Sequence, residues 1–109
     1  MNRISLISKE ARIVLFAADW CGYCRRFLSV INEYESRLET PIPSSDEIVV
    51  VNVESGDGSL WEDFRISLVP TIAVFSNGRE IFRRDGKPFV GLERKDLEDA
   101  IRAVASKKN

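Results

Sequence analysis

The sequence predicts an α/β fold, in which a parallel βαβ unit and an antiparallel β-hairpin form a small mixed sheet flanked by helices. Short apolar runs rich in β-branched residues occur at 13–18, 48–53 and 71–75, which is typical of buried strands. Stretches with apolar residues three and four apart follow the first two runs and close the chain, as in helices. The pair Asn77-Gly78 predicts a tight hairpin. Helices then cover the faces of the sheet.

The first half of the chain predicts a strand, a long helix and a second strand. Residues 13–18, IVLFAA, are apolar throughout, which predicts a central parallel strand buried on both faces. Residues 22–38 carry one apolar stripe, so a helix begins at the cysteine motif. The prolines and serines of 40–45 predict a turn. Residues 48–53, IVVVNV, are β-branched almost throughout and predict another buried strand.

The second half predicts a short helix, a hairpin and a closing helix. Residues 55–59, SGDGS, are turn formers. Apolar residues in 60–66 fit a short amphipathic helix. The strand 71–75 and a strand through 81–82 flank the Asn-Gly pair and should be antiparallel. Apolar positions in 93–106 predict the last helix.

Length and composition indicate one soluble domain over residues 1–109, with 1–12 as a short N-terminal segment in which 4–7 could add an edge strand. Hydrophobic residues make up 44% and charged residues 30% of the chain, and the net charge is -1. No basic stripe favours nucleic acid as a partner. No signal peptide is visible, and the apolar runs are too short to span a membrane. We expect a cytoplasmic monomer, although a chain cut from a longer secreted precursor would look the same.

The chain has only two cysteines, and both lie in the run WCGYC at 20–24. Cys21 falls at the start of the predicted helix, where free N–H groups and the helix dipole stabilise a thiolate. We expect Cys21 to be the nucleophile. Cys24 is one turn further on the same face and can resolve a mixed disulfide on Cys21. Arg25 and Arg26 add positive charge nearby.

Two other uses of the cysteine pair fit less well. A permanent disulfide between Cys21 and Cys24 would close a very small ring and remove little entropy from the unfolded chain. A zinc site needs four ligands, and the chain has no histidine and no third cysteine. We therefore expect no bound metal and no cofactor apart from the redox-active pair itself.

Three separated motifs resemble the thioredoxin family, and the resemblance runs from about Ile13 to the C-terminus. The first is ADWCGYC at 18–24, after an apolar strand. The second is Val-Pro-Thr at 69–71, and the third is Asn-Gly at 77–78 with the later Val-Gly at 90–91. A Cys-x-x-Cys beside a βαβ pattern is itself a thioredoxin signal. Together the motifs imply the thioredoxin fold.

The resemblance implies the activity of a thiol–disulfide oxidoreductase, with protein disulfides as substrates. It also implies a cis peptide bond between Val69 and Pro70 that leaves the Val69 backbone free to pair with an extended substrate. A separate reductase, such as thioredoxin reductase, or else glutathione would renew the cysteine pair. The residues expected to form the substrate-docking surface around Cys21 are Trp20, Gly22, Tyr23, Val69, Pro70 and Gly91.

Three positions depart from the family pattern. Leu15 stands where thioredoxins carry a buried Asp, and Val50 stands where they carry a Lys. Because a carboxylate there would act as a general base for Cys24, its loss puts efficient reductase turnover in doubt. Asp19 is close in sequence but is expected at the surface, outside that role. Tyr23 replaces the usual Pro between the cysteines, which leaves the direction of electron flow open.

Two alternatives stay open beside the thioredoxin-like enzyme. Cys-x-Tyr-Cys also resembles glutaredoxins and some bacterial disulfide isomerases, so a glutathione-coupled enzyme is one of them. Against it, residues 90–93, VGLE, lack the Gly-Gly pair that glutaredoxins use near the glutathione carboxylate. The other alternative is a binding module of the same fold, in which the cysteines do no chemistry.

Overall fold

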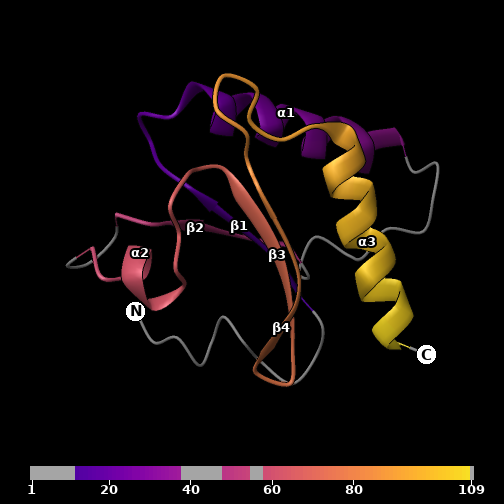
Figure 1. The fold of residues 1–109 in the computed structure, drawn as a ribbon. Helices are drawn as coiled ribbons and strands as arrows, with labels where there is room; N and C mark the ends of the chain where they lie inside the picture. The colour runs from indigo at the N-terminus through magenta and orange to yellow at the C-terminus, as the bar shows by residue number, and fades with distance from the viewer. Residues whose placement is uncertain (1–11, 38–47, 55–57, 109) are drawn as a thin grey trace.

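The computed structural model describes residues 12–37, 48–54 and 58–108 (Figure 1). The predicted turn at 40–45 and the possible edge strand at 4–7 lie outside these residues. The described elements follow the predicted order of strands and helices. They are β1 (Arg12–Ala17), α1 (Gly22–Arg37), β2 (Ile48–Asn52), α2 (Leu60–Asp63), β3 (Thr71–Ser76), β4 (Arg79–Asp85) and α3 (Arg94–Lys108).

The strands form a mixed sheet of four, in the order β2-β1-β3-β4. β1 pairs with β2 in parallel and with β3 in antiparallel register. β3 and β4 form the antiparallel hairpin, and both Asn77 and Gly78 at its turn have positive φ angles, 53° and 77°. The left-handed conformation at both positions is what an Asn-Gly hairpin turn requires. The predicted α/β fold with a small mixed sheet is therefore confirmed.

The apolar run of β1 is continuous because both faces of the sheet are covered. Ile13 and Leu15 point into a core shared with α1 and α3. Val14 and Phe16 point into a second core, which includes Leu60 of α2. Figure 1 shows the sheet between α2 and the pair α1 and α3. Successive strand residues face opposite sides, so a central strand needs apolar residues at every position.

Two predictions about individual elements were wrong in part. The strand 48–53 was predicted to be buried, but in the described part of the chain β2 is an edge strand, and Val50 is 50% exposed. β-branched residues favour strand geometry both at the centre and at the edge of a sheet, so the sequence of this strand did not indicate that it lies at an edge. The helix predicted over 60–66 is a single turn, α2, after which Arg65 has φ 56°. None of the helices in the described ranges is long and apolar enough to cross a membrane.

Candidate active site

The sulfur of Cys21 lies at the N-terminus of α1, in the place of a helix-capping group. The backbone N–H of Cys24 donates a hydrogen bond to Cys21 Sγ over 3.1 Å. The Cys21 carbonyl accepts the N–H of Arg25 at 3.3 Å, as the first helical bond. N–H groups of a first helical turn have no partner within the helix, and they stabilise an anion that lies close to them. The first turn of α1 therefore presents a backbone donor to the sulfur of Cys21.

Cys24 lies behind Cys21 and is almost fully buried, with 1% of its surface exposed. Burial, followed by a hydrogen bond with Cys21 and repulsion from that sulfur, raises the pKa of Cys24 from 9.0 to about 12. A backbone hydrogen bond from Ala18 and the charge of Arg25 act in the opposite direction but are outweighed. Cys24 therefore stays a thiol at neutral pH.

Val69 faces the cysteine pair from the loop before β3. The S–H of Cys21 points to the carbonyl oxygen of Val69 at 3.6 Å, and the Val69–Pro70 peptide bond is cis. Within the described residues the backbone N–H of Val69 has no hydrogen-bond acceptor. This segment therefore offers a backbone donor directly beside the Cys21 sulfur.

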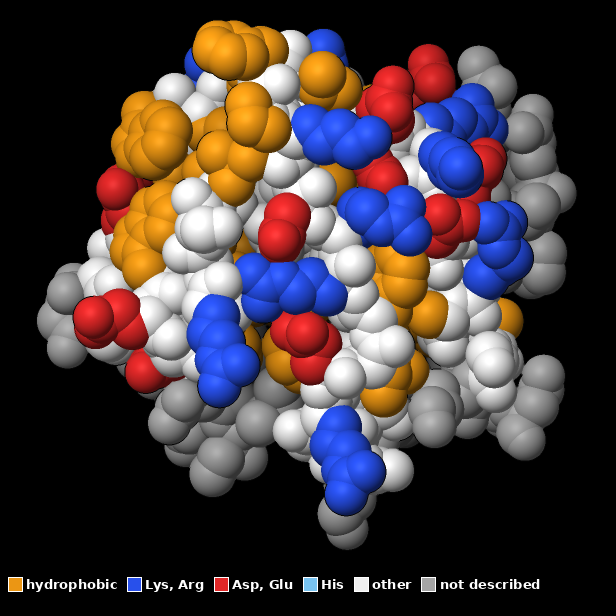
Figure 2. Space-filling model, in the orientation of Figure 1, with side chains coloured by type: hydrophobic (Ala, Val, Ile, Leu, Met, Phe, Trp, Pro, Cys, Tyr) orange, Lys and Arg blue, Asp and Glu red, His pale blue; other side chains and the backbone are white. Residues whose placement is uncertain are grey.

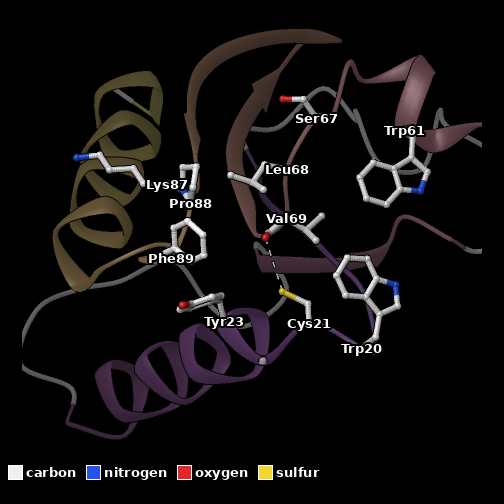
Figure 3. Close-up of a pocket in the computed structure, with 12 residues that line it drawn as sticks. Trp20, Cys21, Tyr23, Trp61, Ser67, Leu68, Val69, Lys87, Pro88 and Phe89 are labelled. Carbon is white, nitrogen blue, oxygen red and sulfur yellow. Dashed lines mark hydrogen bonds between the residues drawn. The ribbon is translucent and has the colours of Figure 1, made fainter.

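A cavity of about 270 Å³ opens beside Cys21 (Figure 3). Five of the six predicted docking residues line it: Trp20, Gly22, Tyr23, Val69 and Gly91. Pro70 is buried and does not reach the cavity. Trp20 is 62% and Tyr23 38% exposed, so both rings are available at the surface.

Six further residues line the same cavity without having been predicted. They are Trp61, Ser67, Leu68, Lys87, Pro88 and Phe89. Trp61 was expected only as part of an amphipathic helix, and the other five were given no role in the site. The signal that could have identified Phe89 is a large apolar side chain directly after a proline in a turn.

The wall formed by Tyr23 is held by contacts with the loop that follows β4. Gly91 has φ 77°, and a Cβ added to it would come within 2.9 Å of Tyr23 Cβ. The guanidinium of Arg26 lies over the Tyr23 ring, 5.2 Å from its centre, and donates a hydrogen bond to the Val90 carbonyl. These contacts fix the loop against the first turns of α1.

On the other side of Cys21, the indole N–H of Trp20 donates a hydrogen bond to Glu54 over 2.9 Å. Glu54 lies in the turn directly after β2, where its N–H donates to the Asn52 side chain at 2.9 Å. The indole ring therefore has a fixed orientation although most of its surface is exposed.

A second hollow, of about 250 Å³, reaches Cys24 from the β2 side. Its charged lining residues are Asp19 and Arg25. Arg25 Nη1 donates to the Asp19 carbonyl oxygen at 2.7 Å, and the Asp19 side chain is exposed, as expected. Leu15 is fully buried and pairs in register with Val50 on β2. At both positions where thioredoxins carry ionisable groups, this sheet therefore presents only apolar side chains.

Gly86 supports the backbone beside the site, and its replacement should destabilise the fold. The N–H of Gly86 donates to the Pro70 carbonyl at 2.9 Å, and a Cβ on Gly86 would come within 2.6 Å of that oxygen. We expect Gly86→Ala to lower the free energy of unfolding by about 1–3 kcal/mol, because a backbone atom has to move. Urea denaturation of the reduced protein measures this.

Gly22→Ala is the matched control for Gly86→Ala. A Cβ at Gly22 would meet only the end of the Arg25 side chain, at 3.9 Å. Since alanine favours helix over glycine, the control should be neutral or slightly stabilising. Equal stability of the two variants would contradict the close approach at Gly86.

No metal centre was found in the part of the chain that the structure describes, since no group of three or more His, Cys, Asp or Glu side chains gathers there.

Comparison with known proteins agrees with this geometry. The thioredoxin family model matches residues 2–103. A thioredoxin from Chlamydia caviae is 30% identical over 103 residues, which cover 94% of this chain and 88% of that protein. A Schizosaccharomyces pombe protein named as a putative protein disulfide-isomerase is 35% identical over 105 residues, which cover 92% of this chain. The match spans only 20% of the length of that second relative.

Solved structures show the same fold. The thioredoxin of Malassezia sympodialis superposes with a TM-score of 0.68 at 23% identity, covering 94% of this chain and 82% of that one. The thioredoxin of Fasciola hepatica gives a TM-score of 0.66 at 21% identity, covering 92% and 86%. The sheet superposes on those of thioredoxins, the Cys-x-x-Cys lies at the start of α1, and the family model matches most of the chain. This chain therefore belongs to the thioredoxin family.

Proposed function

We propose that the chain is a thiol–disulfide oxidoreductase that exchanges its Cys21–Cys24 pair with disulfides of protein substrates. The observation that carries the proposal is that the two thiols differ in their access to the cavity and in their surroundings. Both sulfurs are mostly buried, but Cys21 lines the open cavity and accepts the Cys24 N–H, whereas Cys24 does not reach that cavity and has a raised pKa. The Cys21 sulfur is therefore available to attack a substrate, and the Cys24 sulfur reacts afterwards to resolve the mixed disulfide. Thioredoxins and a protein disulfide-isomerase among the relatives support this class of reaction.

The reaction proceeds in two balanced steps. The Cys21 thiolate attacks one sulfur of the substrate disulfide, whose S–S bond breaks; a mixed disulfide forms, and one substrate thiolate leaves. Cys24 then gives its proton to solvent and attacks Cys21 Sγ, and the S–S bond of the mixed disulfide breaks. The Cys21–Cys24 disulfide forms, and the second substrate thiolate leaves. Two electrons pass from the dithiol to the substrate, and the reverse sequence oxidises a substrate dithiol. The pair itself carries the electrons, so no bound cofactor takes part.

Binding of the substrate uses the backbone at Val69. An extended segment passing Cys21 can accept a hydrogen bond from the Val69 N–H, which lacks an acceptor among the described residues. Such strand-like pairing holds a substrate by its main chain and leaves its side chains to the cavity walls. A reductase or glutathione then returns the oxidised pair to the dithiol.

Two measurements on the reduced protein test the proposal. Reduction of insulin disulfides should be lost in Cys21→Ser, since no attacking sulfur remains. Iodoacetamide should label Cys21 ahead of Cys24, because only thiolates are alkylated and Cys24 stays protonated. Retained insulin reduction in Cys21→Ser, or earlier labelling of Cys24, would refute the assignment of roles.

A coupled assay separates the possible reductants. Turnover that depends on thioredoxin reductase supports the thioredoxin-like enzyme, and turnover that depends on glutathione supports the glutaredoxin-like one. Partner binding that is lost in a Trp20 variant, without measurable turnover in the parent protein, would show a binding module instead.

A further inference from the structure

Phe89, beside the cysteine pair, combines an unfavourable backbone conformation with an exposed aromatic ring. It has φ 65° and is 90% exposed. A bulky residue rarely adopts the left-handed region, and a side chain this exposed contributes little burial to folding. Backbone outliers of this kind concentrate at functional sites. Phe89 therefore needs an explanation outside the stability of the fold.

The turn that carries Phe89 is closely bonded. The N–H groups of Val90 and Gly91 donate to the Lys87 carbonyl at 3.0 Å and 2.8 Å, and the Lys87 N–H donates to the Gly91 carbonyl at 3.1 Å. Arg26 of α1 also donates to the Val90 carbonyl. The Phe89 ring is thus presented by a braced loop, as is typical of a preorganised contact.

Aromatic and apolar side chains stand on both sides of Cys21. Figure 3 shows Tyr23, Pro88 and Phe89 on one side of the sulfur and Trp20 and Trp61 on the other. In Figure 2 hydrophobic side chains gather over the end of the molecule where α1 begins and the loop after β4 turns, whereas acidic and basic side chains mix elsewhere on this face. An occupant that touches both walls has to extend past the reacting sulfur in both directions.

The low charge of the cavity favours an extended protein segment over glutathione as its occupant. Among the described residues that line it, Lys87 alone is charged. Glutathione carries two carboxylates and little apolar surface, so it matches these walls poorly. An extended protein segment with a large apolar side chain near its cysteine matches them well.

We propose that Phe89 selects substrates, favouring protein disulfides whose cysteine has an aromatic or large aliphatic residue within a few positions along an extended segment. The proposal rests on the thiol–disulfide exchange proposed above and names its substrate class. Phe89 and Cys21 line one cavity, so a side chain next to the reacting cysteine can pack against the ring while the sulfurs exchange.

Two peptide disulfides that differ at one position test the selection. Each peptide carries one cysteine as a mixed disulfide with thionitrobenzoate, and the residue two positions from the cysteine is Phe in one and Ser in the other. For the reduced parent protein we expect kcat/KM to be about tenfold higher for the Phe peptide. Phe89→Ser should lower that ratio to about two, and Phe89→Tyr, which keeps the ring, should retain it.

Val30→Ser is the matched control, because it removes a partly buried valine side chain, on α1, outside this cavity. It should leave the ratio at about ten. Phe89→Gly should lower the ratio as Phe89→Ser does and raise Tm by roughly 4 °C, since glycine accepts the positive φ angle. A fall in Tm in Phe89→Gly would show that the ring is needed for the fold, against the proposal.

The outcomes separate this inference from the proposed function. If the parent protein reduces hydroxyethyl disulfide through Cys21 but shows equal kcat/KM for the two peptides, the selection fails and the oxidoreductase stands. If the parent protein reduces neither hydroxyethyl disulfide nor the peptides, the oxidoreductase itself fails. If glutathione disulfide reacts faster than both peptides and slows in Phe89→Ser, the ring serves glutathione and the proposal is overturned.

Discussion

Cys24→Ser is expected to stop turnover and to accumulate a protein joined to its substrate. In this variant the backbone N–H of residue 24 can still donate to the Cys21 sulfur at the start of α1, so attack on a substrate disulfide continues. The serine hydroxyl cannot attack the mixed disulfide, so the second substrate thiolate is not released. We expect insulin reduction to fall on the order of a thousandfold or more.

Non-reducing electrophoresis and intact-mass spectrometry measure the trapped species. After incubation with an oxidised peptide, Cys24→Ser should gain the mass of one peptide half, which dithiothreitol removes. Cys21→Ser is the matched control, because it has the same change of sulfur to oxygen and should gain almost nothing. Equal trapping by the two variants would contradict the separate roles of the cysteines.

The sequence predicted the central part of this fold well, because its signals there are local. β1 is apolar at every position because both of its faces are buried, and α1 has apolar residues three and four apart because one of its faces is buried. The change from one pattern to the other falls at Cys21. The Asn77-Gly78 pair predicted the hairpin for the same reason, since two left-handed positions determine the turn. These features need only neighbouring residues to form.

Features that depend on distant segments could not be predicted in this way. Val50 is β-branched, as a buried strand residue would be, yet it is half exposed because β2 lies at an edge of the described sheet. Phe89 lines the cavity from the loop after β4, which is bonded to α1 through Arg26, a contact between residues 64 positions apart. Its positive φ angle of 65° is unusual for a bulky residue, so the sequence around it does not predict this conformation.

The structure also gives a physical reason for the apolar residue at position 15. Leu15 is packed in the core between the sheet and the helices α1 and α3. A carboxylate at this position would be buried among apolar side chains and, with Val50 beside it in register, would lack a basic partner there. Apolar residues at both positions are therefore mutually consistent, and neither of these two side chains can accept the proton of Cys24.

The release of substrate by Cys24 should consequently depend steeply on pH. In the mixed disulfide Cys21 carries no charge, but burial, the largest cause of the raised pKa of Cys24, remains. The reacting thiolate fraction then grows about tenfold for each pH unit well below the pKa. We expect the rate of the resolving step to rise about tenfold per pH unit from pH 6 upward, until the pH approaches the pKa that Cys24 has in the mixed disulfide. Single-turnover kinetics with a chromogenic peptide disulfide measure it as the phase that follows attack by Cys21.

The same group should make the stability of the reduced protein fall in alkali. The folded state holds the Cys24 proton to about pH 12, whereas an ordinary cysteine loses it near pH 9.0. The folded state thus binds more protons between these values, so this contribution to stability is complete below pH 9 and is lost as pH rises toward 12. The free energy of unfolding should fall by up to about 1.4 kcal/mol per pH unit more steeply than in Cys24→Ala. Urea denaturation from pH 8 to pH 11 gives both slopes.

Parallel curves for the two proteins, together with a resolving rate independent of pH, would mean that Cys24 ionises as an exposed thiol does. Burial would then no longer explain why Cys21 attacks first.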